Sequence, residues 1–186
     1  MSKNKKIIGI LCTLSILCTT KVYAGTFSGG FGTGKLTYGV GGGSSSIAKT
    51  AASQWNGVSS KVSLTYTSAT DKYGSKGNII TYFDSSNAPT AGALGYTYVY
   101  KSWTGLSGSI GTTSDRWVKA VVYQYKSSYL DTTTKKTHTA THELGHALSV
   151  AHPNSSSTNA VMQQGARTSY KLQPYDKNNL ISKWGK

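Results

Sequence analysis

The segment from residue 141 to residue 152 constrains this chain most, because it gathers ionisable side chains that are scarce elsewhere. Three of the chain's four histidines and its one glutamate lie there, in the order His142, Glu143, His146 and His152. Residues four apart on a helix lie one turn above the other, so the first two imidazoles share a face. Imidazoles placed in this way, with a glutamate beside the first, form the HExxH pattern of zinc sites. The fold must therefore present one helix at a metal site.

His152 extends the pattern to a third imidazole. It lies six residues after His146, where a continuing helix would turn it away from the metal, so we expect the chain to leave the helix near Ser149. Pro153 supports this exit, since the residue before a proline favours extended backbone. Three neutral imidazoles leave one position of a tetrahedral zinc ion open, which is typical of a catalytic rather than a structural site.

Residues 142–152 read H-E-x-x-H-x-x-S-x-x-H and resemble the HExxHxxGxxH signature of the metzincin metalloproteases. In that family a methionine-containing turn runs beneath the zinc site, and Met162, in the stretch 159–162, matches that methionine. Ser149 replaces the glycine of the signature. A left-handed backbone there costs a non-glycine residue on the order of 1 kcal/mol, so we expect a strained helix exit.

The C-terminal stretch is similar to the last helix of the matrixin branch of that family. Residues 172–176 (LQPYD) are followed by Leu180, Trp184 and Gly185, an ending like the aromatic-glycine pair of matrixins. Asp176 matches an acid that hydrogen-bonds the methionine turn in matrixins. A negative charge at a helix N-terminus is the alternative role for this residue.

The resemblance implies a zinc-dependent endopeptidase that hydrolyses peptide bonds. One zinc ion on His142, His146 and His152 would lower the pKa of its bound water and polarise the scissile carbonyl. Glu143 would act as general base toward that water and deliver the proton to the leaving amine. Met162 would support the site without touching substrate. The implied partner is a protein or peptide substrate, and we expect a monomer.

Two other functions fit the residues. A cationic secreted binding protein on the same scaffold would use Tyr96, Tyr98 and Tyr100, whose period of two places them on one side of a strand, to hold a glycan or anionic surface. Packing of these rings against the core is the favoured interpretation of the row. A hydrolase that cuts the peptide crosslinks of a cell wall is the other possibility.

Two further sets of residues have open roles. Calcium is possible but unsupported, because the aspartates show no calcium-loop spacing; they are Asp71, Asp84, Asp115 and Asp131. His138 lies one turn before His142 on the same helix face. We expect it to be solvent-exposed at the helix start rather than to be a metal ligand.

Residues 1–24 have the composition of a secretory signal peptide. Three lysines precede an apolar run over residues 7–18, and Val22-Tyr23-Ala24 forms a small-residue cleavage site. We therefore predict a secreted, extracellular protein whose catalytic domain is residues 25–186, with no membrane span after cleavage. Both cysteines lie inside the apolar run, so the mature domain would have no thiol to close the zinc site.

Basic residues outnumber acids, with 20 lysines and arginines against 6 aspartates and glutamates and a formal net charge of +14. Such a charge favours contact with polyanionic surfaces. Solubility of a secreted protein explains the same lysines equally well. The lysines are scattered and no nucleic-acid-binding motif is present, so we predict no specific nucleic-acid partner.

Hydrophobic periodicity indicates a helix and several strands in a chain long enough for a single domain, and the resemblance to metzincins implies the α+β class. After a plausible cap at residues 44–46, an apolar helical face runs from Ile47 to Trp55 and ends at Gly57. Strands are expected at residues 36–40, 62–66, 78–83, 96–100 and 118–125, with a long polar loop at 103–116. Strand, helix and strand in succession indicate a crossover. The expected fold is a twisted, mostly parallel mixed sheet with an active-site helix, a packing helix and a C-terminal helix, as in metzincins.

Overall fold

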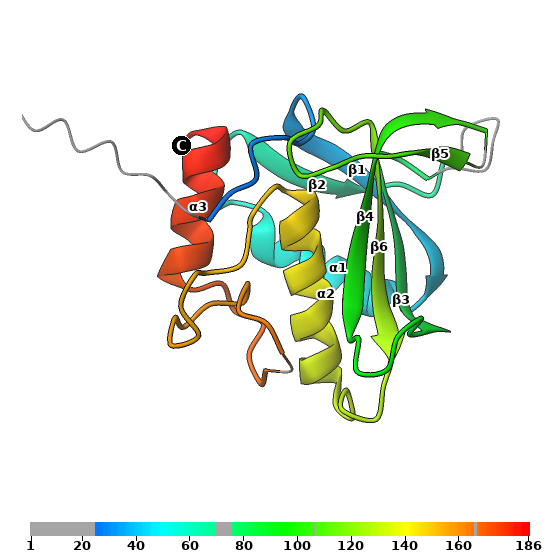
Figure 1. Cartoon of the computed structure of the whole chain (residues 1–186), viewed down its shortest axis with the longest axis vertical. Coiled ribbons are helices and arrows are strands. Elements are labelled where there is room, and N and C mark those ends of the chain that lie inside the picture. Colours follow the sequence, from blue (N-terminus) through cyan, green and yellow to red (C-terminus); the bar gives the residue numbers. More distant parts are fainter. Residues whose placement is uncertain (1–24, 70–75, 106, 166) are drawn as a thin grey trace, which may run out of the picture.

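The computed structural model describes residues 25–69, 76–105, 107–165 and 167–186, and these form a six-stranded sheet with three helices (Figure 1). The strands are β1 (Gly34–Gly43), β2 (Val62–Tyr66), β3 (Ile79–Asn87), β4 (Gly95–Thr104), β5 (Ser107–Ile110) and β6 (Lys119–Lys126). The helices are α1 (Ser45–Trp55), α2 (Thr133–Ala147) and α3 (Pro174–Trp184). Residues 1–24, the predicted signal peptide, lie outside the described residues. No helix of the described part has the length and apolar character needed to cross a membrane.

The sheet has the strand order β2-β1-β3-β6-β4-β5. The neighbours β2, β1, β3 and β6 are parallel, whereas β4 is antiparallel to both β6 and β5. Since parallel neighbours need a crossover, α1 carries the chain from β1 to β2. The predicted α+β fold with a mostly parallel mixed sheet and three helices is confirmed.

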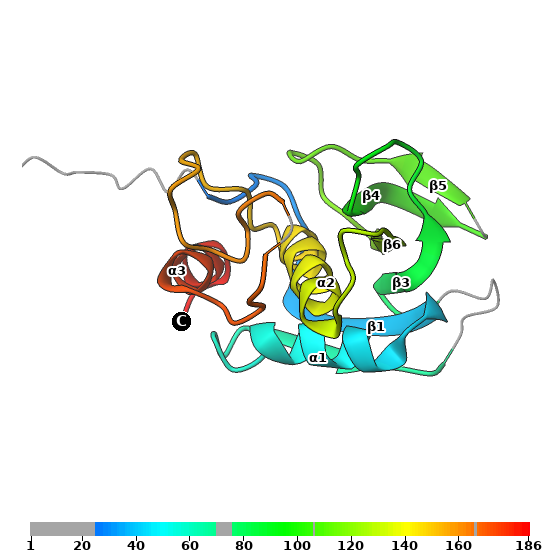
Figure 2. The same ribbon diagram turned by 90° about the horizontal axis from the view of Figure 1, so that it is seen from below.

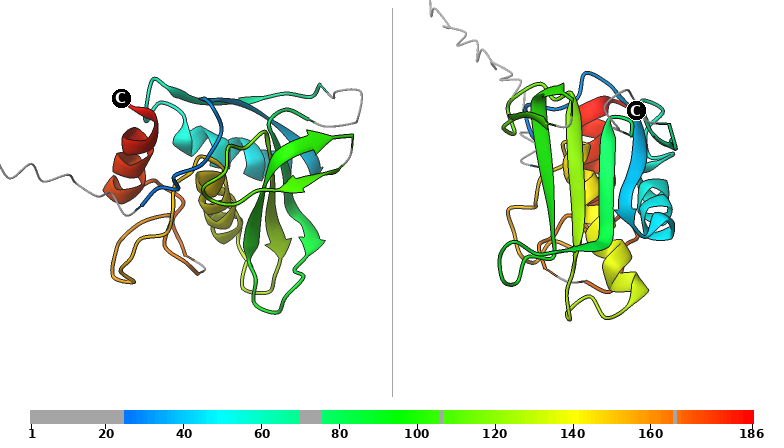
Figure 3. Two further views of the ribbon diagram at one scale, coloured as in Figure 1. Left: turned by 45° about the horizontal axis from the view of Figure 1, so that its top comes forward. Right: turned by 90° about the vertical axis from the view of Figure 1, so that its right-hand side faces the viewer.

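All three helices lie on one side of the sheet (Figure 3, right). Helix α2 lies between the sheet and α3, while α1 packs along α2 and beneath β1 (Figure 2). The hydrophobic core fills the space between the inner face of the sheet and these helices. Helix α2 is therefore enclosed on several sides, which fixes the segment that bears the histidine motif.

Helix α1 forms as its sequence predicts. The Ser44 side chain accepts a hydrogen bond from the Ile47 N–H at 3.3 Å and caps the first turn. Its buried face is the predicted apolar one, and the helix ends at Trp55, two residues before Gly57 turns the chain at φ 80°. The Trp55 indole N–H donates to the Thr141 carbonyl at 2.9 Å, so α1 is hydrogen-bonded to α2 as well as packed on it.

The long polar loop predicted at residues 103–116 is wrong in part. Strand β4 continues to Thr104 and forms a hairpin with β5, in which Tyr100 pairs with Ile110 and Ser102 with Ser109. The β5 segment, SGSI, holds a single apolar residue, so it carries no alternating pattern that would reveal a strand. Its pairing comes from the neighbouring strand rather than from its own composition.

The tyrosine row of β4 lies on the sheet face opposite the helices. Tyr96, Tyr98 and Tyr100 do share one side of the strand, but none belongs to the core, and Tyr96 is 53% exposed. Their neighbours on that face include Tyr82 and Tyr123, whose rings stack at 5.2 Å with an interplanar angle of 14°. The expectation that the row packs against the core is therefore wrong: Tyr96 contacts Tyr98, Tyr98 also contacts Tyr123, and Tyr100 contacts Trp103.

We predict that Gly145→Ala destabilises the protein by about 1–3 kcal/mol, because a Cβ on this residue would lie 2.3 Å from the Met162 Sδ and 2.6 Å from the Trp55 Cζ2. Helix propensity alone predicts the opposite sign, a gain of about 1 kcal/mol. Urea unfolding of the metal-free protein decides between them, with the exposed helix substitution Thr134→Ala as the control. Stabilisation by Gly145→Ala would contradict the close packing described here.

Candidate metal centre

Helix α2 places the histidine motif in its last two turns. It starts at the N-cap Thr132, whose hydroxyl accepts from the Lys135 N–H at 3.3 Å. Residues 142–146 therefore lie in the enclosed half of the helix, with His142 8% and Glu143 6% exposed. Burial of these polar side chains requires that each finds a partner.

The chain leaves α2 abruptly after Ala147. The Ser149 N–H donates to the His146 carbonyl and the Val150 N–H to the Gly145 carbonyl, both at 2.9 Å. Ser149 itself has φ 65°, the left-handed conformation that the sequence predicts at this exit, and it is fully buried.

Residues at the start of the described chain hold this exit in place. The Phe27 N–H donates to the Ser149 carbonyl at 2.9 Å, and the Ala151 N–H donates to the Gly25 carbonyl at 2.7 Å. The Ser149 hydroxyl donates to the Gly29 carbonyl at 3.1 Å. A short extended segment thus pairs with the loop that leads to His152.

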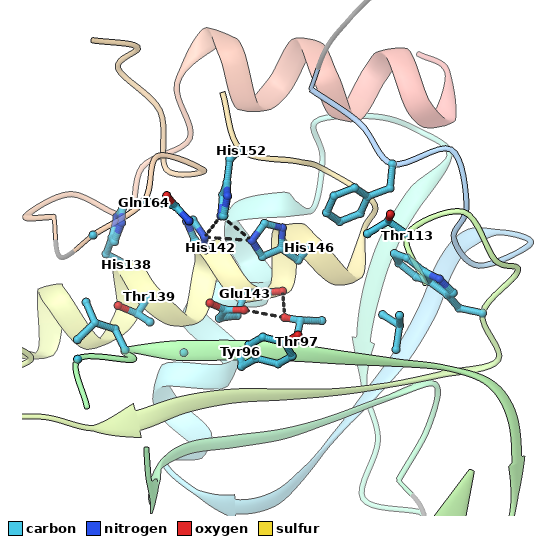
Figure 4. Close-up of a pocket in the computed structure, with 17 residues that line it drawn as sticks. Tyr96, Thr97, Thr113, His138, Thr139, His142, Glu143, His146, His152 and Gln164 are labelled. Carbon is cyan, nitrogen blue, oxygen red and sulfur yellow. Dashed lines mark hydrogen bonds between the residues drawn. The ribbon is translucent and has the colours of Figure 1, made fainter. Parts of the chain in front are cut away.

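The three imidazoles meet at one point (Figure 4). Their Nε2 atoms are separated by 3.0 Å between His142 and His152, 3.0 Å between His146 and His152, and 3.1 Å between His142 and His146. A tetrahedral zinc ion with bonds of about 2.05 Å separates its ligand nitrogens by about 3.3 Å. The separations in this structure are close to that value.

Backbone carbonyls fix the tautomers of two of these rings. The His142 Nδ1 lies 2.8 Å from the Val161 carbonyl oxygen and the His146 Nδ1 lies 2.9 Å from the Val150 carbonyl oxygen. Because a carbonyl only accepts, both Nδ1 atoms donate, and in the neutral rings both Nε2 atoms carry a lone pair. Two lone pairs that face each other repel, and a cation among the three nitrogens relieves that repulsion. The residues therefore fit a zinc ion with one open position.

Burial keeps the imidazoles neutral. It lowers the pKa of His142 well below its usual range and that of His146 to about 4, and the neighbouring imidazoles lower both further. Burial also lowers the pKa of His152. Since a metal ligand must be unprotonated, these shifts prepare the group for a cation at neutral pH.

The aspartates do not form a calcium site among the described residues. Asp84 and Asp131 each pair with a lysine of α2, at 2.7 and 2.8 Å. Asp115 accepts from its own turn, and Asp71 lies outside the described residues. His142, His146 and His152 are the cluster in the described part of the chain that could hold a metal ion.

Glu143 lies beside the imidazoles with its carboxylate turned toward β4 (Figure 4). Burial raises its pKa to about 8, and a hydrogen bond from Thr97 partly opposes this. The Thr97 Oγ1 is 2.8 Å from the Glu143 Oε2. A positive charge held by the adjacent imidazoles favours the ionised carboxylate and so lowers this pKa.

The turn that contains Met162 supports the site from beneath. Asp176 is fully buried at the start of α3, and its carboxylate accepts hydrogen bonds from the N–H groups of Val161 (2.9 Å), Met162 (3.1 Å) and Gln173 (2.8 Å). Burial raises the pKa of Asp176, and these three bonds oppose the shift. Both roles considered for Asp176 therefore occur together, because it holds the turn and caps α3.

His138 is buried, contrary to the exposure expected at the helix start. It is 1% exposed, and its Nδ1 donates to the Ser169 carbonyl at 2.7 Å. Its Nε2 has no hydrogen-bond partner among the described residues. The segment after Met162 folds back over this turn of α2, and nothing in the local sequence of α2 reveals that cover.

A cavity of about 460 Å³ opens beside the three imidazoles. Its wall includes Phe27, Gly95, Thr97, Trp117 and Gln164. The Phe27 ring stacks on the His146 imidazole at 5.7 Å and 23°. Sequence analysis missed these residues. Thr97 alternates with the tyrosine row of β4, so its inward position follows only from the outward position of that row in the structure.

Comparison with known proteins reveals a shared fold. No protein-family model matches the chain, and no curated protein sequence matches it. Two solved structures of myroilysin, a metalloprotease, have TM-scores of 0.53 and 0.50, each at 13% identity, and cover 87% and 88% of this chain and 98% and 93% of their own. Metalloproteinase-II from Bacteroides fragilis is more distant, with a TM-score of 0.40, 11% identity, and coverage of 90% of this chain and 60% of its own. The chain thus shares the overall fold of the myroilysin structures, and the predicted arrangement of sheet and helices is confirmed.

We predict that zinc affinity stays nearly constant as the pH falls from 7 to 5.5. Three histidines with ordinary pKa values near 6.5 would lose roughly 10³-fold over that range, because a proton competes at each ligand. The lowered pKa values confine this competition to lower pH, so we expect a loss under about tenfold. Chelator competition measures the zinc affinity, and the Glu143→Gln substitution removes the neighbouring carboxylate so that only the histidines contribute to the pH dependence. A hundredfold loss by pH 5.5 would refute the prediction.

We predict that Ser149→Gly is more stable than Ser149→Ala by about 1 kcal/mol. Both lose the hydroxyl bond to the Gly29 carbonyl, which keeps Lys183 as a second donor at 2.7 Å, so this loss costs each about 0.5–1.5 kcal/mol. Only glycine relieves the positive φ. Urea unfolding of the metal-free proteins measures the difference, and equal midpoints for the two variants would show that the exit is unstrained.

Proposed function

We propose that residues 25–186 are a secreted zinc-dependent endopeptidase of the metzincin type. The observation that carries the proposal is the convergence of three imidazole nitrogens beside a buried glutamate at the wall of a cavity. When bound, zinc supplies a Lewis acid that polarises the scissile carbonyl and acidifies a water molecule. Secretion rests on the signal-like residues 1–24, and placement near the matrixin branch rests on Asp176 and the C-terminal helix.

His142, His146 and His152 are the proposed metal ligands and Glu143 the proposed general base. The carboxylate takes a proton from the attacking water and later gives it to the amine nitrogen as the C–N bond breaks, so one proton is carried from water to leaving group. Its raised pKa falls toward neutrality beside a positive charge, which suits a group that must both accept and donate a proton. Met162 supports the ligands from beneath.

The edge of β4 suits an extended peptide. Strand β4 pairs with β6 from Gly95 to Tyr100, but with β5 only from Tyr100 to Thr104. The opposite edge of β4 near Gly95 and Thr97 borders the cavity. A peptide that adds to this edge as a further strand would bring its backbone carbonyl to the imidazoles.

The binding-protein alternative depends on the tyrosine face. In the row of β4, Tyr96 is 53% exposed and lies against Tyr98 with ring centroids 4.5 Å apart. A binding surface formed by these rings does not account for three converging imidazoles beside a buried glutamate, and the site geometry therefore favours hydrolysis. Cell-wall peptide hydrolysis uses the same chemistry and differs from general proteolysis only in substrate.

We predict that Glu143→Gln keeps zinc and lowers casein cleavage by about 10²–10⁴-fold, because only the general base is removed. His146→Ala should lose both zinc and cleavage. Zinc content is measured by atomic absorption and cleavage by release of peptides, with chelation followed by zinc addition to establish dependence. Unchanged cleavage by the Glu143→Gln variant would exclude the proposed mechanism.

The zinc-loaded and chelated proteins also distinguish the proposed endopeptidase from a cell-wall hydrolase and from a binding protein. Cleavage of purified cell wall without cleavage of casein would identify a wall hydrolase. Adhesion that is salt-sensitive and survives chelation, with no hydrolysis of either substrate, would identify a cationic binding protein and contradict the proposal.

A further inference from the structure

Two neighbouring inward positions of β4, Gly95 and Thr97, enclose the Glu143 carboxylate. Strand alternation turns them toward α2, while Tyr96 and Tyr98 between and beyond them face outward. A Cβ on Gly95 would lie 2.7 Å from the Glu143 Cγ and 2.8 Å from its Oε1. The strand backbone therefore approaches the carboxylate as closely as a glycine permits.

Thr97 contacts Glu143 at two oxygens. Its Oγ1 is 2.8 Å from the carboxylate Oε2 and 2.8 Å from the Glu143 backbone carbonyl oxygen (Figure 4). No other hydrogen bond reaches the carboxylate among the residues that the structure describes. Thr97 is thus the one described side chain that fixes the orientation of Glu143.

A hydroxyl has one proton and two lone pairs, and this arrangement uses both properties. When the carboxylate is ionised, the Thr97 O–H donates to Oε2. When the carboxyl group carries a proton on Oε2, that O–H donates to Oγ1, and the Thr97 proton turns to the backbone carbonyl of Glu143. Rotation of one hydroxyl hydrogen satisfies both states, and no heavy atom has to move.

We propose that Thr97 is a positioning residue that holds the Glu143 carboxylate in one place while it gains a proton from water and passes it to the leaving amine. This inference rests on the proposed peptidase function. Thr97 transfers no proton itself; the water proton goes to Glu143 and then to the amine nitrogen. The carboxyl proton is bonded to one oxygen at a time: on Oε1 it leaves the hydrogen bond from Thr97 to Oε2 unchanged, and on Oε2 it is accepted by the Thr97 Oγ1.

The test compares Thr97→Val, which keeps the branched shape and removes the hydroxyl, with Thr97→Ser, which keeps the hydroxyl. We expect Thr97→Val to lower kcat by about 10- to 100-fold, as a misplaced catalytic group does, with KM and zinc content within about twofold of the parent. Thr97→Ser should restore most of kcat. Tyr98→Phe, on the outward side of the same strand, is the control and should leave kcat unchanged.

A double-mutant cycle distinguishes loss of carboxylate positioning from a general structural effect of the Thr97→Val substitution. In a Glu143→Gln background the hydroxyl has no carboxylate to position, so Thr97→Val should lower the residual rate less than twofold. If Thr97→Val lowered the residual rate of the Glu143→Gln variant by the same 10- to 100-fold as in the parent, the proposal would be overturned. Equal loss in the Val and Ser variants, or loss that follows zinc content, would overturn it as well.

Failure of the peptidase function gives a different result. If the parent protein with zinc cleaves neither casein nor cell wall, the proposed function is wrong. If the parent cleaves and Thr97→Val cleaves equally well, only the role of Thr97 is wrong.

Discussion

The structure depends on one constraint, that three imidazole nitrogens must face a single point with their lone pairs free. An isolated helix supplies two such rings but leaves their second nitrogens undefined. Here the carbonyls of Val161 and Val150, which lie in two different loops, receive the Nδ1 protons of His142 and His146. The lone pairs at the centre are thus oriented by peptide groups outside the helix, one of them just beyond its end and the other 19 residues after His142.

Asp176 connects this constraint to the rest of the domain. Its buried carboxylate holds the Val161 and Met162 N–H groups, and the Val161 carbonyl in turn orients His142. Hydrogen bonds to a charged acceptor contribute about 1.5–3 kcal/mol each, so α3 contributes to the site without touching it. The methionine itself fills the space under Gly145, where a larger residue on the helix would not fit.

The sequence allowed prediction of those parts of the structure that local chemistry determines. The helix that bears the histidine motif, its exit at Ser149 and the position of Met162 follow from spacing, turn chemistry and motif. Features that arise from contacts between distant segments could not be predicted in this way. His138 is covered by a segment some thirty residues downstream, β5 pairs only because β4 presents an edge to it, and Tyr98 packs against Tyr123 of β6.

The pairing of Gly25 and Phe27 with Ala151 and Ser149 has a consequence for the order in which the domain assembles. These contacts join segments that lie more than 120 residues apart in the sequence, so they close a long loop and are expected to form late in folding. They complete the set of hydrogen bonds that hold the loop to His152. Tight metal binding by all three imidazoles is therefore expected to require that these two distant segments have already paired.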